Sequence, residues 1–366
     1  MFRQRADRAR ARMRELGVDA ILLSVGPDLP YLTGYEAMPL ERLTMLVLPV
    51  DGEATLVVPR LEAPRVVERP DVFSLRGWDE TDDPVAIVTG LVSPATTVAI
   101  GDRTWARFLV DLQAASPATR FTRGGDVMGA LRARKDADEV EALRRAGAAA
   151  DRVAGELQRG DIELVGRTEA QVSAELGRRL RAEGHHRVNF AIVAAGDNAA
   201  SPHHEPGDRV ITEGEVVLCD FGGTMLGPDG IGYCSDITRC VHLGEPDAEV
   251  AEAYAVLLEA QQAAVAAALV GTPCEEVDAT ARRIITEAGW GEQFIHRTGH
   301  GIGIEEHEDP YIVAGNRAPL EPGHAFSIEP GIYVPGRFGF RLEDIVVATE
   351  AGPDPLNCAD HDLALL

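Results

Sequence analysis

Acidic residues interrupt or end apolar, strand-like runs at four places in the second half of this chain. The four are Asp220 after 216–219, Asp236 within 233–237, Glu329 after 325–328, and Glu343 within 340–347. Asp and Glu are almost never fully buried unless they are paired or bind a metal. A fold that buries these runs is therefore expected to gather the acids around a cation.

The charge of such a cluster predicts how many ions it holds. Four carboxylates carry −4, and their repulsion would raise their pKa values unless cations are present. Two divalent ions supply +4, so the count favours a two-metal site. Asp220 and Asp236 stand on successive runs joined by Gly222-Gly223 and the turn-rich segment 227–230. An antiparallel hairpin would place the two carboxylates side by side.

An imidazole ligand is expected from the segment Thr298–Gly303, where glycines flank His300 and let the backbone approach the site closely. His296 and His300 are four residues apart, as in a helical zinc pair, but the glycines argue against a helix. The segment is also a poor phosphate-binding loop. Oxygen-rich ligation with one imidazole suits Mn, with Co or Zn also possible.

Each acid also has an ordinary structural interpretation. A single Asp in a strand is more often a turn or rim residue, and Glu329 before Pro330-Gly331 could mark a strand end. Glu343 could pair with Arg341 on a solvated face. Each residue alone is a weak signal, whereas the set indicates a site.

The chain has 366 residues, which favours two domains. A Pro-, Ser- and Gly-rich stretch at 114–125 breaks the periodicity, so we expect domains at 1–125 and 126–366. All ten histidines lie at position 185 or later, which places the chemistry in the second domain.

The sequence pattern predicts an α+β protein. The expected helices are 2–16, 136–158, one from Thr168 to Gly184, one from Pro246 to about Gly271, and one from Thr272 to Gly289. The expected strands are 43–49 and 54–59, paired as a hairpin, and 97–100, 188–195, 215–221, 233–243, 325–329 and 340–348.

Composition excludes several classes of function. Lys plus Arg number 35 and Asp plus Glu 59, so the net charge is 35 − 59 = −24, which makes nucleic acid or a membrane a poor partner. Five cysteines without a CxxC pair argue against a disulfide framework or thiolate zinc site and favour a reducing cytoplasm.

Five motifs occur in an order that resembles the signature of the pita-bread metallopeptidases, and within them the Xaa-Pro peptidases aminopeptidase P and prolidase. They are Asp220-Phe221-Gly222-Gly223, Ser235-Asp236-Ile237-Thr238-Arg239, Thr298-Gly299-His300-Gly301-Ile302-Gly303, Ile328-Glu329-Pro330-Gly331-Ile332-Tyr333 and Arg341-Leu342-Glu343-Asp344. The resemblance covers roughly residues 130 to 360. The first part of the chain resembles, more loosely, the creatinase-type N-terminal domain.

The resemblance implies a ligand set and several substrate contacts. Asp220, Asp236, His300, Glu329 and Glu343 would ligate two metal ions, with Asp236 and Glu343 bridging. His203 and His307 match family histidines at the substrate, whereas His204 is expected to be a bystander. His296 and Tyr333 would line the cleft, and Arg341 would support the carboxylates.

The implied activity is metal-assisted hydrolysis of the Xaa-Pro bond in short proline-containing peptides. Glu329 would relay a proton, and a histidine would stabilise the oxyanion. We prefer a dipeptidase (prolidase) because the first domain is compact. The alternatives are an aminopeptidase P acting on longer peptides and a non-catalytic binding module. Creatinase lacks the carboxylate ligand set, and methionine aminopeptidase lacks a comparable first domain.

Two further expectations follow from the resemblance. Relatives are commonly dimers or tetramers, so a homodimer is expected. Asp220 and Asp236 are 16 residues apart, more than is usual in the family, with 225–231 as the extra length. The two ligands keep their register only if this excess forms the tip of a hairpin.

Overall fold

The computed structural model describes residues 1–92, 95–227 and 230–366, and it divides into two compact units. The first contains Met1–Arg132, and the second contains Ala133–Gly227 with Gly232–Leu366. Helix α5 (Gly125–Ala133) begins where the sequence places the domain boundary and ends where the second unit begins. The boundary at residue 125 stays a prediction.

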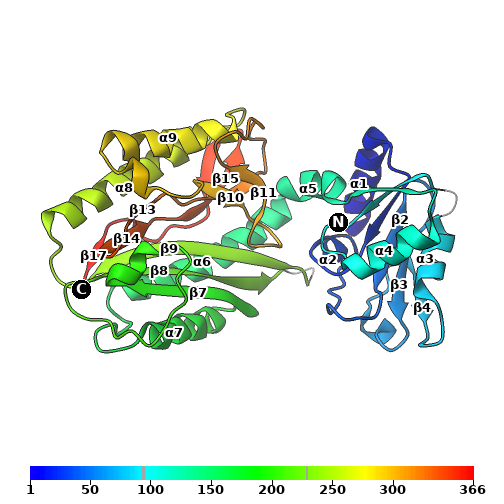
Figure 1. The fold of residues 1–366 in the computed structure, drawn as a ribbon, viewed down its shortest axis with the longest axis horizontal. Coiled ribbons are helices and arrows are strands. Elements are labelled where there is room, and N and C mark those ends of the chain that lie inside the picture. Colours follow the sequence, from blue (N-terminus) through cyan, green and yellow to red (C-terminus); the bar gives the residue numbers. More distant parts are fainter. Residues whose placement is uncertain (93–94, 228–229) are drawn as a thin grey trace. The chain divides into compact units, whose positions relative to one another are not determined.

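The first unit is built on a six-stranded mixed sheet in the order β4-β3-β2-β1-β5-β6 (Figure 1). Its strands are β1 (Ala20–Leu23), β2 (Met45–Pro49), β3 (Ala54–Pro59), β4 (Phe73–Trp78), β5 (Thr97–Ile100) and β6 (Arg120–Arg123). β2 pairs antiparallel with both β1 and β3, which confirms the expected hairpin, whereas the outer pairs are parallel.

The other helices of the first unit are α1 (Phe2–Leu16), α2 (Asp28–Thr33), α3 (Pro84–Val92) and α4 (Ala106–Ala115). Helix α1 confirms the helix expected over 2–16, and its Ala6, Ala9 and Met13 are buried, whereas Leu16 at its end is exposed. Gly17 ends the helix in the left-handed conformation, with φ 66°, which glycine adopts at little cost. Within the described residues, no helix of either unit is long and apolar enough to cross a membrane.

The second unit contains three sheets, in the orders β17-β9-β8-β7, β11-β10-β12-β15-β16 and β13-β14. The strands are β7 (Arg187–Ala195), β8 (Val216–Leu226), β9 (Gly232–His242), β10 (Gly299–Gly301), β11 (Glu308–Ile312), β12 (Ala325–Ile328), β13 (Gly331–Val334), β14 (Phe338–Arg341), β15 (Asp344–Thr349), β16 (Gly352–Pro355) and β17 (Ala364–Leu365). The long hairpin β8–β9 carries the first two predicted ligands.

Four long helices cover these sheets: α6 (Ala137–Gln158), α7 (Glu169–Ala182), α8 (Ala248–Ala267) and α9 (Cys274–Glu287). The capping boxes expected at Asp136 and Thr168 are both present. The expected start of α8 at Pro246 is wrong, because the Asp247 side chain accepts the Val250 N–H and makes Asp247 the N-cap. That helix also ends at Ala267, short of the predicted Gly271.

Each half of the second unit has its own apolar core. α6 and α7 pack on the sheet of β7, β8 and β9 around residues such as Val153, Leu176 and Phe221. α8 and α9 pack on β12, β14 and β15 around residues such as Leu257, Ile285 and Phe326. Figure 1 shows α8 and α9 on one side of the strands and α7 on the other, with α6 overlapped by β8 and β9 in this view.

Candidate metal centre

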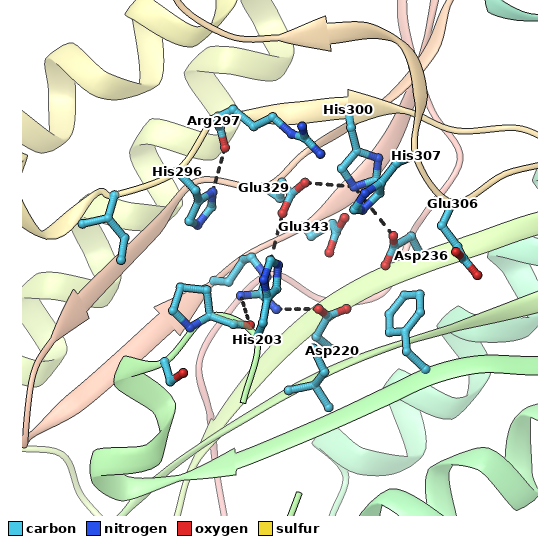
Figure 2. Close-up of a pocket in the computed structure, with 16 residues that line it drawn as sticks. His203, Asp220, Asp236, His296, Arg297, His300, Glu306, His307, Glu329 and Glu343 are labelled. Atoms are coloured by element: carbon cyan, nitrogen blue, oxygen red, sulfur yellow. Dashed lines mark hydrogen bonds and ion pairs between the residues drawn. The ribbon is translucent and has the colours of Figure 1, made fainter. Parts of the chain in front are cut away.

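Asp220 and Asp236 share one face of the β8–β9 hairpin. The register pairs Asp220 with Thr238 and Gly222 with Asp236, so the two acids are offset by two residues across the strands. Diagonal neighbours at this offset remain within reach of each other. Both side chains line the same pocket, as the hairpin hypothesis predicted (Figure 2).

The long spacing between the two acids does not disturb their register. Pairing runs without a shift from Val216–Leu226 on one strand to Gly232–His242 on the other. The extra length therefore lies in the distal paired ends of the strands and in their connection. The turn expected at 227–230 includes Pro228 and Asp229, which lie outside the described residues.

His300 and Glu329 come from adjacent strands and are linked by one hydroxyl group. His300 lies on β10, which pairs antiparallel with β12, and Glu329 follows β12 directly. Ser327 accepts the His300 N–H at 3.0 Å and donates to Glu329 Oε1 at 2.9 Å. A Cβ at Gly299 would meet the Ser327 carbonyl oxygen at 1.9 Å, so glycine is what lets β10 lie this close to β12. The expected close approach of this backbone to the site itself stays a prediction.

Glu343 does not lie within a strand, and the expectation of one strand over 340–348 is wrong. β14 ends at Arg341 and β15 begins at Asp344, because β14 pairs with β13 and β15 pairs with β12. At the crossing between sheets, the Glu343 N–H donates to the Thr238 carbonyl at 3.3 Å. The Thr238 hydroxyl donates to Glu343 Oε2 at 2.7 Å. Arg341 and Glu343 therefore do not share a strand, although both line the pocket.

Arg341 is buried and donates a hydrogen bond to one of the acids, Asp220. Its guanidinium donates to Asp220 Oδ2 at 2.5 Å, to the Tyr333 hydroxyl at 2.9 Å and to Thr238 Oγ1 at 3.2 Å. Arg341 is 2% exposed and Glu343 1% exposed, so the interpretation of these two residues as a solvated ion pair is wrong.

The pKa values of the clustered acids indicate that their ionised forms need additional positive charge nearby. Burial, and then the neighbouring acids, raise the pKa values of Asp236 and Glu343 well above their ordinary range. Burial also raises the pKa of Asp220, although Arg341 opposes this. Burial opposes ionisation of Glu329 as well, but His300, together with His296 and Arg341, outweighs it and holds the pKa of Glu329 below its ordinary value.

Three carboxylate oxygens of the cluster are buried without a hydrogen-bond partner: Asp220 Oδ1, Asp236 Oδ1 and Glu343 Oε1. Leaving a buried acceptor unpaired costs about 1–3 kcal/mol, and more for a charged group. Ligand atoms of Asp236, His300 and Glu343 also lie within 4.8 Å of one another. These side chains fit a divalent cation, which would satisfy the unpaired oxygens and offset their charge.

Two adjacent histidines have different environments. His203 lines the pocket, as predicted. His204 instead contacts Glu169 Oε2 through Nε2 at 2.7 Å, and the Glu169 side chain is fully buried. Glu169 also accepts the Ala195 N–H at 2.9 Å. His204 therefore belongs to a structural network, in line with the bystander role expected for it.

The other predicted pocket histidines lie at opposite ends of one segment. His296 shares a hydrogen bond with the Tyr333 hydroxyl at 2.9 Å, and burial lowers the pKa of its ring. His307 lies in the exposed loop that follows β10, and its ring centroid is 4.0 Å from that of His300. Both rings line the pocket. Tyr333, expected to line the cleft, is not among the lining residues, and its hydroxyl contacts His296 and Arg341 instead.

The pocket has a volume of about 840 Å³. Its charged and imidazole lining groups are His203, Asp220, Asp236, His296, Arg297, His300, Glu306, His307, Glu329, Arg341 and Glu343. The sequence interpretation missed Arg297, Glu306 and the supporting hydroxyl of Thr238. Thr238 had a signal, since it shares a strand face with Asp236. Arg297 and Glu306 had none beyond their proximity to His296 and His307.

Comparison with known proteins finds two family matches. Residues 141–350 match the model of metallopeptidase family M24, and residues 5–134 match that of the creatinase/prolidase N-terminal domain. All the predicted site residues lie within the first of these matches. The two matches follow each other along the chain in the order that the motifs indicated.

Three relatives match over nearly their full length. A probable dipeptidase, PepE, from Mycobacterium tuberculosis is 43% identical over 370 residues, covering 100% of this chain and 97% of the relative. The crystal structure of prolidase from Thermococcus sibiricus has a TM-score of 0.92 at 36% identity and covers 100% and 99% of the two chains. The Xaa-Pro dipeptidase from Bacillus anthracis has a TM-score of 0.90 at 30% identity, with 100% coverage of both.

Proposed function

The chain belongs to metallopeptidase family M24, with a creatinase-type N-terminal domain and a pita-bread catalytic domain, and from that premise we propose that it is a dipeptidase that hydrolyses the Xaa-Pro bond. The family relationship makes it a metal-dependent peptidase, and its relatives indicate dipeptide substrates. The preference for proline, the metal and the residue roles are our proposal.

One observation carries the proposal: acids from three separate segments line one pocket, and three of their buried oxygens have no hydrogen-bond partner. Asp220, Asp236, His300, Glu329 and Glu343 would hold two divalent ions. Mn is the proposed metal because oxygen ligands with one imidazole suit it. When bound, such ions lower the pKa of water and polarise a carbonyl group.

We propose that Glu329 moves the proton. Its Oε1 atom is engaged by the Ser327 hydroxyl at 2.9 Å and by His300 at 3.1 Å. Its Oε2 atom lies 4.0 Å from Arg341 Nε and accepts no hydrogen bond from the residues that the structure describes. Oε2 would therefore accept the proton of the attacking water and return it to the leaving amine.

The other side chains of the pocket would bind and orient the peptide. His203 and His307 line the pocket as imidazoles that can donate a hydrogen bond to the developing oxyanion. Arg341 holds Asp220 in place through its hydrogen bond. The free α-amine of the substrate would lie near the acids, which suits an exopeptidase. Both histidines and all five ligands are present, which favours an enzyme over a binding module.

The test compares peptides after loading with Mn²⁺. We expect an Ala-Pro dipeptide to be hydrolysed faster than both Ala-Ala and an Ala-Pro-Pro tripeptide. Faster hydrolysis of the tripeptide would favour the aminopeptidase P alternative, and cleavage of neither proline peptide would contradict the proposal. The homodimer stays a prediction, which light scattering of the purified chain would check.

A further inference from the structure

The chain contains a single lysine, and that lysine is buried. Of the 35 basic side chains, 34 are arginines and one is Lys135. The Lys135 side chain is 1% exposed, and its Nζ atom lies 2.7 Å from Oε1 of Glu308, whose side chain is 6% exposed. An ammonium is a compact charge, whereas a guanidinium is larger and planar. This position therefore differs from the other basic positions of the chain in the kind of cation that it holds.

The space around this ion pair is closely filled. A Cβ at Gly303 would lie 2.4 Å from Glu308 Oε1 and 3.1 Å from Lys135 Cε. A Cβ at Gly323 would lie 2.6 Å from the Lys135 carbonyl oxygen, and the Lys135 N–H donates to the Gly323 carbonyl at 2.8 Å. Lys135 also directly precedes Asp136, the N-cap of α6. Lys135 is therefore a fixed point at the start of a long helix.

Glu308 closes the loop that carries His307. The loop consists of residues 302–307, between β10 and β11, and Glu308 is the first residue of β11. The Glu308 carboxylate reaches back to Gly303, near the start of the same loop. The N–H of Cys234 on β9 donates to the Gly303 carbonyl at 2.8 Å. The start of the loop is thus held by β9, and its end is held by Glu308 and Lys135.

His307 depends on this loop for its position. His307 is exposed, whereas the adjacent Glu308 is buried. Successive side chains of an extended segment point to opposite faces, so burial of Glu308 turns His307 the other way, and the His307 ring lines the pocket. The ring makes no hydrogen bond with the part of the chain that the structure describes, and it lies beside the His300 ring (Figure 2). Its position is therefore set by the backbone of its loop and by His300.

Stability alone does not explain a buried ion pair at this place. Removing two charges from water costs about as much as their attraction returns, so an apolar pair of similar volume is often as stable or more stable. A short contact between two charged groups does fix the distance between the segments that carry them. Here those segments are the start of α6 and the end of the loop 302–307.

We propose that Lys135 is a positioning residue, which through Glu308 holds the loop 302–307 so that the His307 ring reaches the reacting carbonyl group. The inference rests on the proposed function, in which His307 donates a hydrogen bond to the developing oxyanion. It adds to that function a residue outside the pocket lining on which the geometry of the oxyanion contact depends.

The first test replaces both partners, because removal of one alone would leave an unpaired buried charge. Lys135→Met combined with Glu308→Met, the paired variant, nearly keeps the volume and should unfold in urea at the wild-type midpoint. With Mn²⁺ and Ala-Pro, we expect kcat to fall about 10- to 100-fold, since a small misplacement of a catalytic group has this effect. KM should stay within about twofold, because the oxyanion develops only in the transition state. A folded paired variant with wild-type kcat overturns the proposal.

Lys135→Arg carries the same test if the paired variant does not fold. It keeps the charge of the pair and places a larger head group against Glu308. We expect kcat to fall about tenfold, with KM again within about twofold, because the end of the loop is displaced. Unchanged kcat in Lys135→Arg would contradict the proposal.

A double-mutant cycle tests whether the effect passes through His307. His307→Ala alone should lower kcat about 100-fold. When His307→Ala is already present, the paired variant should lower kcat by less than about a further twofold, because the ring that Lys135 positions is gone. Losses that multiply would show that the ion pair acts on the structure in general, and they would overturn the assignment.

A control variant makes the same chemical change in another ion pair of the second unit. Glu156 on α6 and Arg179 on α7 pair at 2.6 Å outside the pocket lining. Glu156→Met combined with Arg179→Met should leave kcat within about twofold. A loss as large as that of the paired variant would contradict a role specific to the loop 302–307.

Nuclear magnetic resonance of the histidine rings measures the position of His307 without turnover. The full chain is loaded with Zn²⁺, which is diamagnetic, and the His307 signal is identified by its loss in His307→Ala. In the paired variant, we expect this signal to shift and broaden, whereas the signal of His242, outside the pocket lining, stays unchanged. This result stands even if neither proline peptide is cleaved, so it separates the inference from the proposed function. An unchanged His307 signal in the paired variant overturns the role of Lys135, whatever the substrate.

Discussion

Glu343 and Asp344 are adjacent in sequence and both are buried, yet they belong to clusters of opposite character. Glu343 lines the pocket and has an unpartnered oxygen. Both oxygens of Asp344 are occupied: Oδ1 accepts from Arg239 at 2.7 Å, and Oδ2 accepts from Gln261 at 3.1 Å and contacts His361 at 2.5 Å.

The pKa directions of the two acids follow this difference. Burial and the neighbouring acids raise the pKa of Glu343 well above its ordinary value. Burial opposes ionisation of Asp344 too, but hydrogen bonding from His361 and the Arg239 charge lower its pKa. A buried acid with all its partners in the chain is part of the architecture, whereas an acid left short of partners requires a ligand. The comparison predicts that substitutions in the pocket lower activity, whereas substitutions around Asp344 lower the free energy of unfolding.

Glu343→Gln should have the largest effect, and on activity alone. Loss of an outer partner of a metal site costs about 10- to 100-fold, so loss of a ligand should lower kcat/KM by more than 100-fold. The metal-free variant should be at least as stable as the wild type, since a buried acid with a raised pKa is removed. Steady-state hydrolysis of Ala-Pro and urea unfolding of the metal-free protein check the two parts. A variant with half the wild-type activity would contradict the assignment.

Arg239→Met should disrupt the hydrogen bonds around Asp344 and lower the free energy of unfolding. The guanidinium of Arg239 is fully buried and also donates to the Glu343 carbonyl at 2.7 Å. Its removal leaves Asp344 short of its cation, which costs about 3–5 kcal/mol of unfolding free energy. Urea unfolding of the metal-free variant measures this loss. A loss below about 1 kcal/mol would show that Gln261 and His361 suffice.

The adjacent histidines repeat the comparison on a smaller scale. His203→Ala should lower kcat about 100-fold without a change in stability, because the ring faces the pocket. His204→Ala should leave kcat within about twofold and cost about 1–2 kcal/mol, because Glu169 loses one partner. Kinetics and urea unfolding of both variants under the same conditions are the measurement. The comparison fails if the two effects are exchanged.

Ser327→Ala should have the smallest effect. It tests a residue that supports the proposed metal ligands without being a ligand itself. Its hydroxyl links the His300 backbone to Glu329 and touches no substrate atom in the proposed mechanism. We expect about a tenfold loss of Mn²⁺ affinity, in keeping with an outer partner of a metal site. Calorimetric titration with Mn²⁺ measures it, with Ser327→Cys as a variant of similar size. An unchanged affinity would mean that the strand pairing alone positions His300.

The sequence allowed the ligand set to be predicted because burial of acids is rare and the five motifs are long. The hairpin geometry of Asp220 and Asp236 was also predictable, since strand alternation and the glycine-rich connection are local features. The crossing at Leu342-Glu343 was not, because Phe340 and Leu342 before it and the apolar run 345–348 after it together read as one strand. Its break depends on contacts with Pro330 and Thr238, which are distant in sequence.

Asp344 and Arg297 are two further residues whose surroundings could not be predicted from the sequence. Asp344 lies in the same motif as Glu343, and only the positions of Arg239, Gln261 and His361 show that it is fully engaged. Arg297 lines the pocket, which no pattern of residue types in the sequence indicates.

A titration of the metal-free wild-type chain with Mn²⁺ at neutral pH, followed by calorimetry and by metal analysis of the dialysed protein, tests the central claim most directly. The account predicts two ions per chain, with a gain in thermal stability that grows with the metal concentration. A chain that retains no divalent ion, and whose stability is indifferent to Mn²⁺, Co²⁺ and Zn²⁺, would contradict it.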